Sequence, residues 1–153
     1  MAERQEHAMK RHRALNMGRF AVQMNVSNYG DVLMAERGAL PHEKIRRASV
    51  QGIVDTGATH LVLPKDVAVK LGLQETGAAT VRYADQRPAK RKMVEQAYVE
   101  LLGRHGTFKA IVEPRRHDAL IGAIVMEDLD LVVDCVAQKL RPRDPKGVLA
   151  VLE

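Results

Sequence analysis

The chain has 153 residues, of which 46% are hydrophobic and 28% charged, while only 3% are aromatic. This composition is typical of one globular domain with an aliphatic core. The net charge of +5 would suit an anionic partner, but the Lys and Arg clusters are short and few aromatic residues lie among them. A surface that stacks nucleic-acid bases is therefore not expected.

Several signals bear on where the protein works. No apolar run reaches the roughly 20 residues of a membrane-spanning helix, and the N-terminal MAERQEHAMKRHR lacks the apolar centre of a secretion signal. We therefore expect a cytoplasmic protein without a membrane partner, with a flexible N-terminal extension over residues 1–16. The single cysteine, Cys135, is predicted to be a buried thiol in a reducing compartment. The six histidines have no metal-ligand spacing, so no metal or other cofactor is expected.

The first part of the chain has the pattern of strands separated by turns. Residues 19–27 alternate apolar and polar side chains, which predicts a half-buried strand. A turn over Asn28–Asp31 and a loop over Glu36–Glu43 are expected next. Lys44–Asp55 is predicted as a strand that becomes fully apolar near its end, and His60–Pro64 as a short strand after the turn.

The middle of the chain predicts a helix and a long hairpin. Pro64 suits the first position of a short helix, and Gly72 suits its C-terminal cap. Ala79–Gly103 has the pattern of a hairpin with its tip near Asp85–Pro88, where Asp and Pro favour a turn. Gly106–Pro114 alternates again and predicts another strand.

The last part predicts short elements and completes the expected architecture. Ala119–Asp134 has the pattern strand, glycine, short helix, strand, while Gln138–Pro142 and Gly147–Glu153 could pair at a sheet edge or a subunit interface. The fold class is therefore mainly β with one or two short helices. We expect the domain to cover residues 17–145, followed by a C-terminal strand or tail at 146–153.

Two parts of the chain repeat one order of elements: strand, loop, apolar strand, glycine, helix. The first part contains SVQGIVDTGA and PKDVAVKLG, and the second contains TFKAIVEP and ALIGAIVMEDL. Where the first part has Asp55, Thr56 and Gly57, the second has an apolar pair followed by Gly122. This predicts two related half-motifs in each chain, of which only the first carries a carboxylate.

The segments VDTGATHLVLP, VRYADQRP and ALIGAIVMEDLDLVVD together resemble the retropepsin-like (retroviral-type) aspartic peptidases, and in particular their single-domain bacterial members. The resemblance covers about Phe20 to Pro142. It implies the closed β-barrel of the acid-protease fold. It also implies that the hairpin Thr80–Val94 is a flap over a cleft that holds an extended peptide.

The resemblance also implies a catalytic mechanism and its residues. In this family two carboxylates flank one water and share a proton, so that one acts as base and the other as acid. This chain has one Asp-Thr-Gly turn, so the second Asp55 would come from a symmetric copy in a homodimer. The residues implied as catalytic are Asp55, Thr56 and Gly57. Those implied as substrate-binding are Ala58, Tyr83, Ala84, Asp85 and Gln86.

Other interpretations stay open beside the aspartic endopeptidase. Asp55 and Asp85 could each be plain turn residues, because Asp is favoured in turns. The chain could also form a catalytically weak or inactive dimer that only binds extended segments. A basic dimer that binds nucleic acid through its Lys and Arg clusters is the third possibility, and salt-sensitive binding would distinguish it.

Overall fold

The computed structural model describes residues 19–152 of the chain. The predicted extension over residues 1–16 lies outside the described residues. In the described part, no helix has the length and apolar character needed to cross a membrane.

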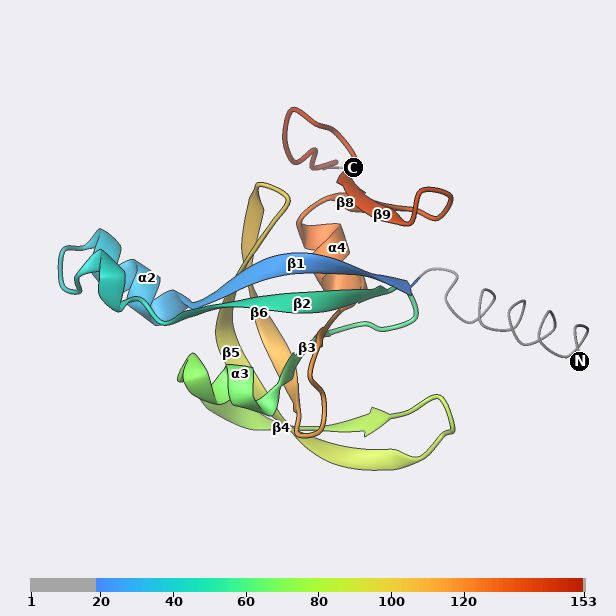
Figure 1. Ribbon diagram of the computed structural model, residues 1–153, viewed down its shortest axis with the longest axis horizontal. Helices are drawn as coiled ribbons and strands as arrows, with labels where there is room; N and C mark the ends of the chain where they lie inside the picture. The colour runs from blue at the N-terminus through green and yellow to red at the C-terminus, as the bar shows by residue number, and fades with distance from the viewer. Residues whose placement is uncertain (1–18, 153) are drawn as a thin grey trace, which may run out of the picture.

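A closed barrel of six strands forms the centre of the molecule (Figure 1). The neighbouring strands run in the order β1-β2-β7-β3-β6-β5, and an antiparallel ladder between β1 and β5 closes the ring. This confirms the mainly β, closed-barrel prediction. The barrel strands are β1 (Arg19–Asn28), β2 (Arg47–Asp55), β7 (Ala119–Ile121), β3 (Leu61–Pro64), β6 (Arg104–Glu113) and β5 (Pro88–Leu101).

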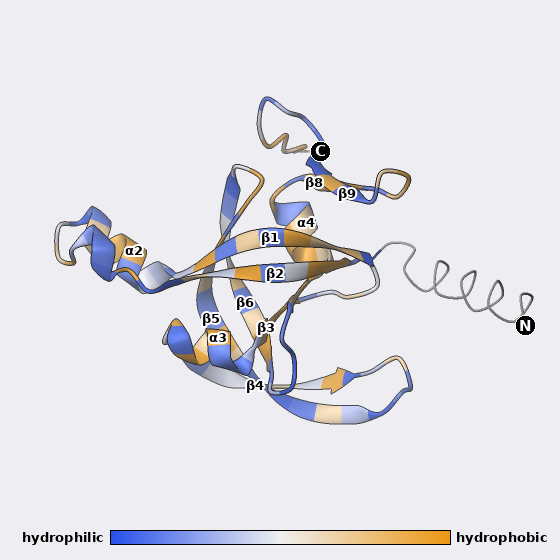
Figure 2. Cartoon of the chain, in the orientation of Figure 1, coloured by the Kyte–Doolittle hydropathy of each residue, from blue (hydrophilic) through white to orange (hydrophobic). Residues whose placement is uncertain are grey.

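The barrel interior is filled almost entirely by aliphatic side chains, as the composition predicts. Val26, Val54, Leu63 and Val99 have no exposed surface. Figure 2 shows the apolar residues alternating with polar ones along β1 and β2, which is the pattern of strands with one face on the core. Each fully buried side chain of this size stabilises the fold by about 1.5–3 kcal/mol.

The predicted long hairpin is present and extends beyond the barrel. It consists of β4 (Glu75–Arg82) and the first part of β5, joined by a tip at residues 83–87. The alternation along β5 fails at Glu95 because the register with β6 shifts between Val94 and Ala97. Gln96 has a positive φ of 63° there, so the bulge lets both Val94 and Ala97 face the core.

The predicted turn at Asn28–Asp31 is wrong, because a helix begins there. Helix α2 (Tyr29–Glu36) is capped by Asn28, whose side-chain oxygen accepts the N–H of Asp31 at 3.1 Å. The predicted loop after it holds one turn of 3₁₀-helix, η1 (His42–Lys44). An Asn side chain caps a helix and starts a turn through the same kind of hydrogen bond, so the pattern did not separate the two.

The short elements after residue 64 follow the predicted order. Helix α3 (Lys65–Lys70) begins directly after Pro64, and helix α4 (Ala123–Asp128) follows β7 and Gly122. Strands β8 (Leu131–Asp134) and β9 (Lys139–Pro142) pair as a separate two-stranded sheet. The apolar segment after residue 147 forms no strand within residues 148–152, and its large side chains are exposed.

Cys135 is exposed, so the prediction of a buried thiol is wrong. It lies in the tight turn between β8 and β9. The Asp134 side chain accepts the N–H groups of Val136 and Ala137 at 3.1 and 3.0 Å, which fixes this turn at the surface. Because this turn lies at the surface, the Cys135 side chain does not reach the hydrophobic core.

The two half-motifs interlock inside the barrel. Residues 52–54 of β2 pair in parallel with β7, and β3 pairs in parallel with residues 110–113 of β6. Because parallel neighbours end at the same edge of a sheet, the turn after β2 and the glycine after β7 are brought side by side.

Candidate active site

Asp55 is the last residue of β2, directly after the fully buried Val54. Its side chain is 15% exposed. One carboxylate oxygen, Oδ1, accepts the N–H of Gly57 at 2.9 Å, and the other, Oδ2, lies 3.2 Å from Nη2 of Arg19. The strand therefore fixes the position of Asp55, while the turn fixes its orientation.

The second half-motif supports the turn that carries Asp55. The carbonyl oxygens of Ala58 and Thr59 accept the N–H groups of Ala123 and Ile124, at 2.8 and 3.0 Å. These are N–H groups at the start of α4, which have no partner within the helix. Carbonyl groups of the first half-motif thus accept the free N–H groups at the start of the helix in the second. These hydrogen bonds hold the turn after β2 against the start of α4.

Gly122 has a steric role in this contact. A Cβ at Gly122 would lie 2.6 Å from the His60 carbonyl oxygen and 2.8 Å from that of Ala58. Its φ of −93° is open to any residue, so space alone requires glycine here. The apolar-apolar-glycine of the second half-motif is therefore the surface on which the Asp55 turn rests.

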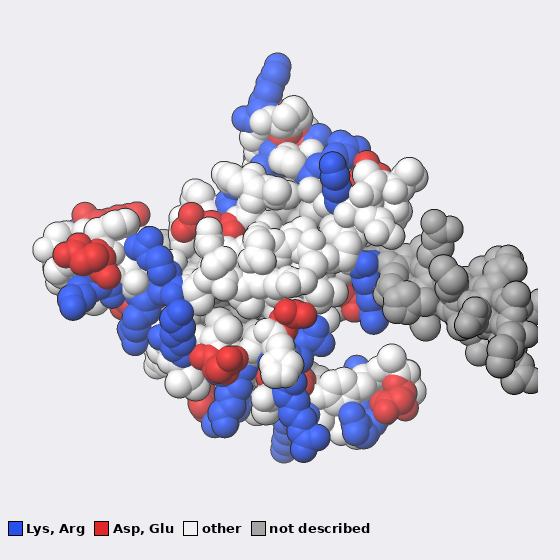
Figure 3. All heavy atoms as spheres, in the orientation of Figure 1, with Lys and Arg blue, Asp and Glu red and all other residues white. Residues whose placement is uncertain are grey.

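Asp55 faces a groove of about 1310 Å³. Its walls come from the turn after β2, from the β4–β5 hairpin and from the loop after β6. Figure 3 shows the molecule hollowed between the barrel and this hairpin. Six of the predicted site residues line the groove: Asp55, Gly57, Ala58, Tyr83, Ala84 and Gln86.

The two other predicted residues, Thr56 and Asp85, do not line this groove. Thr56 is exposed in the single chain. The Asp85 side chain is turned to its own backbone, where Oδ1 accepts the N–H of Arg87 at 3.0 Å. In this chain Asp85 therefore acts as a turn residue, which is the alternative that its sequence left open.

The hairpin tip holds Gln86 in a left-handed conformation, with a φ of 65°. Its N–H donates to the Tyr83 carbonyl at 2.8 Å, which closes a tight turn. Side chains other than glycine pay about 1–2 kcal/mol for this region of backbone space. The backbone at Gln86 is therefore strained, whereas a glycine at this position would adopt the same conformation without strain.

Sequence reasoning missed a polar cluster that joins the hairpin to the barrel. The Tyr83 hydroxyl donates to Oε1 of Glu113 at 2.9 Å, and Arg91 Nε donates to the same oxygen at 3.1 Å. The guanidinium of Arg87 lies 5.1 Å from the centre of the Tyr83 ring, on which it stacks. Glu113 is 30 positions from Tyr83 and 22 from Arg91, and no motif links it to the hairpin.

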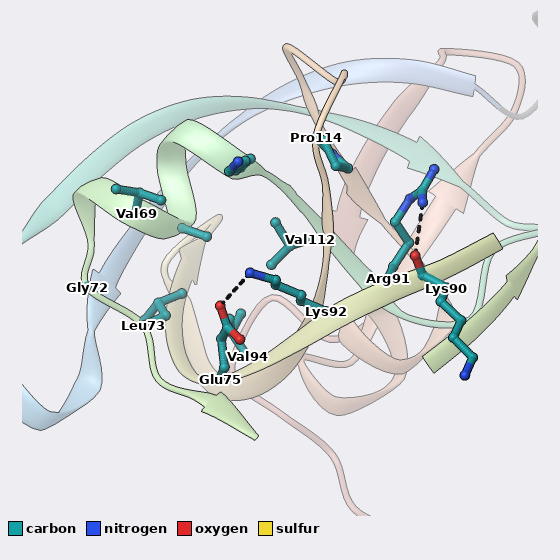
Figure 4. A pocket seen from close by; sticks show the side chains of 12 residues that line it. Val69, Gly72, Leu73, Glu75, Lys90, Arg91, Lys92, Val94, Val112 and Pro114 are labelled. Carbon is teal, nitrogen blue, oxygen red and sulfur yellow. Dashed lines mark hydrogen bonds and ion pairs between the residues drawn. The ribbon is translucent and has the colours of Figure 1, made fainter. Parts of the chain in front are cut away.

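A second, smaller pocket of about 320 Å³ lies between α3 and the base of the hairpin. Figure 4 shows Val69, Leu73, Val94 and Val112 around it, with the ion pair between Lys92 and Glu75 beside them at 3.1 Å. Asp55 does not line this pocket. Within residues 19–152, no three His, Cys, Asp or Glu side chains are grouped so that they could hold a metal ion.

The comparisons with known proteins agree with this geometry. The sequence model of the family described as "Aspartyl protease" matches residues 44–125, more than half of the chain. The match contains the Asp55 turn, the whole hairpin and Gly122, and it confirms the resemblance on which the site was predicted. A comparison with curated proteins found no relative that matches the chain. The chain belongs to the aspartyl protease family.

Proposed function

We propose that the protein is an aspartic endopeptidase that works as a homodimer, with Asp55 of both protomers at one catalytic centre. The observation that carries the proposal is the placement of Asp55: it directly follows the fully buried Val54, lines a large groove and lies within the family match. A carboxylate that lines a groove can act on a peptide bound in that groove.

The proposed reaction needs two carboxylates and a water. The ionised carboxylate takes a proton from the water, which attacks the peptide carbonyl carbon, and the protonated carboxylate donates to the carbonyl oxygen. Protonation of the leaving amine then completes the cleavage. One chain brings one Asp55, so a two-fold axis supplies the second.

Two features of the single chain support such a dimer. Thr56 is exposed, so its hydroxyl is free to bond with the partner's loop, as the family resemblance implies. Val148, Leu149, Val151 and Leu152 are 52–90% exposed, an apolar surface that a second copy would cover. The β4–β5 hairpin of each copy would then lie over the substrate as a flap.

The second candidate is a dimer that binds extended peptides without cleaving them. It is favoured by the ion pair between Arg19 and Asp55. Arg19 occupies the carboxylate oxygen that Gly57 leaves free, so it competes with a catalytic water for that atom. Activity requires this contact to open when substrate or a partner chain arrives.

Cleavage assays on matched variants separate the two candidates. The wild type and Asp55→Asn would be incubated with an unstructured protein from pH 4 to pH 7, with the dimer content measured by sedimentation. Cleavage by the wild-type dimer alone, blocked by a statine-type transition-state analogue, establishes the peptidase. A stable wild-type dimer that cleaves nothing at any of these pH values supports the binding dimer instead.

A further inference from the structure

The groove in front of Asp55 carries a large excess of positive charge. It is lined by two carboxylates, Asp55 and Glu113, and by six arginines from three separate segments. Arg19 comes from β1, three arginines come from the hairpin, and two come from the loop after β6. The hairpin arginines are Arg82, Arg87 and Arg91, and the loop arginines are Arg115 and Arg116.

Only part of this charge is neutralised within the described residues. Arg19 is paired with Asp55 and Arg91 with Glu113, which accounts for both carboxylates of the groove. Arg87 Nε lies 4.0 Å from Asp85, but their side chains are 70% and 65% exposed, so the pair is largely screened by solvent.

The three remaining arginines have no carboxylate partner among the described residues. Arg82 and Arg116 donate to the carbonyl oxygens of Gln86 and Asp118, at 3.4 and 3.1 Å, and these contacts leave their charge uncompensated. Arg115 is exposed and makes no ion pair with a described residue. The groove thus presents guanidinium groups that a ligand can pair with.

These arginines line one stretch of the groove rather than scattered points. The hydrogen bond from Tyr83 to Glu113 holds the hairpin tip next to the end of β6. Arg82 and Arg87 flank Tyr83 in sequence, and Arg115 and Arg116 follow directly after Glu113 and Pro114. Arginines of both segments therefore line the same groove as the contact that joins the segments.

We propose that the groove selects peptides that carry Asp or Glu on either side of the bond that is cleaved. This inference rests on the proposed function, because it names the substrate class of the same site. An extended peptide points alternate side chains to opposite faces, so acidic residues two apart meet the same wall. The planar fork of an arginine binds a carboxylate through two parallel hydrogen bonds, which gives direction as well as attraction.

A nucleic acid is also negatively charged, through its phosphate groups, but the groove suits it less well. Unpaired bases are bound chiefly by stacking on aromatic rings, and Tyr83 is the one Phe, Trp or Tyr residue in the groove lining. Its ring is already engaged by Arg87 and Arg91, whose guanidinium carbons lie 5.1 and 5.9 Å from its centre. The groove therefore offers charge without a platform for bases.

Binding measured with the full-length Asp55→Asn variant tests the selectivity without any cleavage. Three labelled octapeptides would be compared by fluorescence anisotropy, identical except that two positions carry Glu, Gln or Lys. At low salt we expect the Glu peptide to bind at least about 10-fold more tightly than the Lys peptide, because each added pair contributes a modest Coulomb energy. The ratio should shrink at 0.5 M salt.

A charge-reversal variant locates the selectivity. Arg115→Glu combined with Arg116→Glu should remove most of the Glu preference. The matched control is Lys139→Glu combined with Arg141→Glu on β9, which reverses the same number of charges at two exposed residues outside the groove and should leave the preference unchanged. Equal changes in both variants would show a general effect of net charge and would overturn the proposal.

The remaining outcomes are distinguishable from failure of the proposed function. Equal affinity for the Glu and Lys peptides, or no binding of any peptide, overturns the inference. Tighter binding of a single-stranded oligonucleotide than of the Glu peptide also overturns it and assigns the groove to nucleic acid. Wild-type cleavage of the Glu peptide tests the peptidase separately, so tighter binding of the Glu peptide without its cleavage contradicts catalysis alone.

Discussion

Two aspartates, Asp31 and Asp55, lie at opposite ends of the β1–β2 pair, and each faces an arginine. The β1–β2 ladder runs from Arg19 opposite Asp55 to Ser27 opposite Arg47. Figure 1 shows α2, which carries Asp31, at one end of this pair, while the N-terminal end of β1 lies at the other. The two carboxylates share a strand pair and a partner type, but they are bound in very different ways.

Hydrogen bonds fix both carboxylate oxygens and the backbone N–H of Asp31. Its carboxylate accepts the Nε, Nη2 and backbone N–H of Arg46 at 2.8, 3.0 and 3.0 Å. Its own N–H is bonded to Asn28, whose side chain donates to the Leu71 carbonyl of the segment after α3 at 2.8 Å. These contacts tie α2, β2 and α3 together, so Asp31 is a structural carboxylate.

Asp55 is held on one oxygen and only loosely on the other. Gly57 fixes Oδ1, while Oδ2 has a single contact with an arginine whose side chain is 57% exposed. An arginine partner therefore does not decide the role of an aspartate. What differs is the number of acceptor positions left for a water, a substrate or a second carboxylate.

Asp55→Asn should mainly lower activity, whereas Asp31→Asn should mainly lower stability, and the largest effect is expected for Asp55→Asn. In the proposed dimer, Asp55→Asn removes a carboxyl group that would share a proton with its symmetry mate, so kcat should fall by about 10³-fold or more. Peptide cleavage by the dimer is the measurement, and thermal unfolding checks that the fold is intact. Cleavage within 10-fold of the wild-type rate would remove Asp55 from the catalytic role.

The support of the Asp55 turn gives the next largest effect. Gly122→Ala forces a Cβ against the carbonyl oxygens of His60 and Ala58, which are backbone atoms and cannot rotate away. We expect a loss of about 1–3 kcal/mol in the free energy of unfolding, measured with urea, together with weaker activity.

Gly57→Ala is the matched control for this variant. Its Cβ would lie 3.3 Å from a carboxylate oxygen of Asp55, which is a side-chain atom. Its stability loss should therefore be smaller, although its effect on activity should be large. A Gly122→Ala protein as stable as Gly57→Ala would contradict the close approach of the two half-motifs.

At the structural end, Asp31→Asn should lower the stability by about 1–3 kcal/mol at pH 7, toward the lower value because Arg46 is half exposed. The hydrogen bond from the Arg46 side chain holds the pKa of Asp31 below its ordinary value, despite burial. A carboxyl with a lowered folded pKa stabilises the fold above the unfolded pKa and loses this contribution as the pH falls through the folded one.

The pH dependence of this variant follows from that sign. The difference in unfolding free energy between the wild type and Asp31→Asn should be constant from pH 7 to about pH 5 and should shrink below about pH 4. Urea unfolding at a series of pH values measures it. A difference that grows on acidification would mean that the Asp31–Arg46 pair is not the source.

The sequence predicted most of the barrel and little of this distinction between the two aspartates. Alternating apolar residues identify β1 and the hairpin because one face of each strand must be buried, and Asp55 stands out through its apolar flanks. Asp31 and Arg46 are 15 positions apart and belong to no motif. The sequence pattern predicts a turn over Asn28–Asp31, so nothing in it places the Asp31 carboxylate beside a strand.

The missed features share a physical cause. The cluster of Tyr83 and Glu113 and the contact of Gly122 with the His60 backbone join elements that only the closed barrel brings together. The alternation pattern reports whether a residue faces the core, but it does not report which residue it meets there. The positive charge of the groove has the same cause, because its arginines come from three separate segments that only the fold brings together.

The smallest effect is expected for Arg19→Gln, which removes the loose partner of Asp55. Exposed ion pairs of this kind contribute about 0.2–1 kcal/mol, so thermal unfolding should change little. If Arg19 competes with a water for Oδ2 of Asp55, the variant should cleave a neutral peptide somewhat faster than the wild type. A fall in cleavage comparable to that of Asp55→Asn would instead make Arg19 part of the catalytic centre, and the two ends of the β1–β2 pair would then differ in their chemistry as well as in their hydrogen bonding.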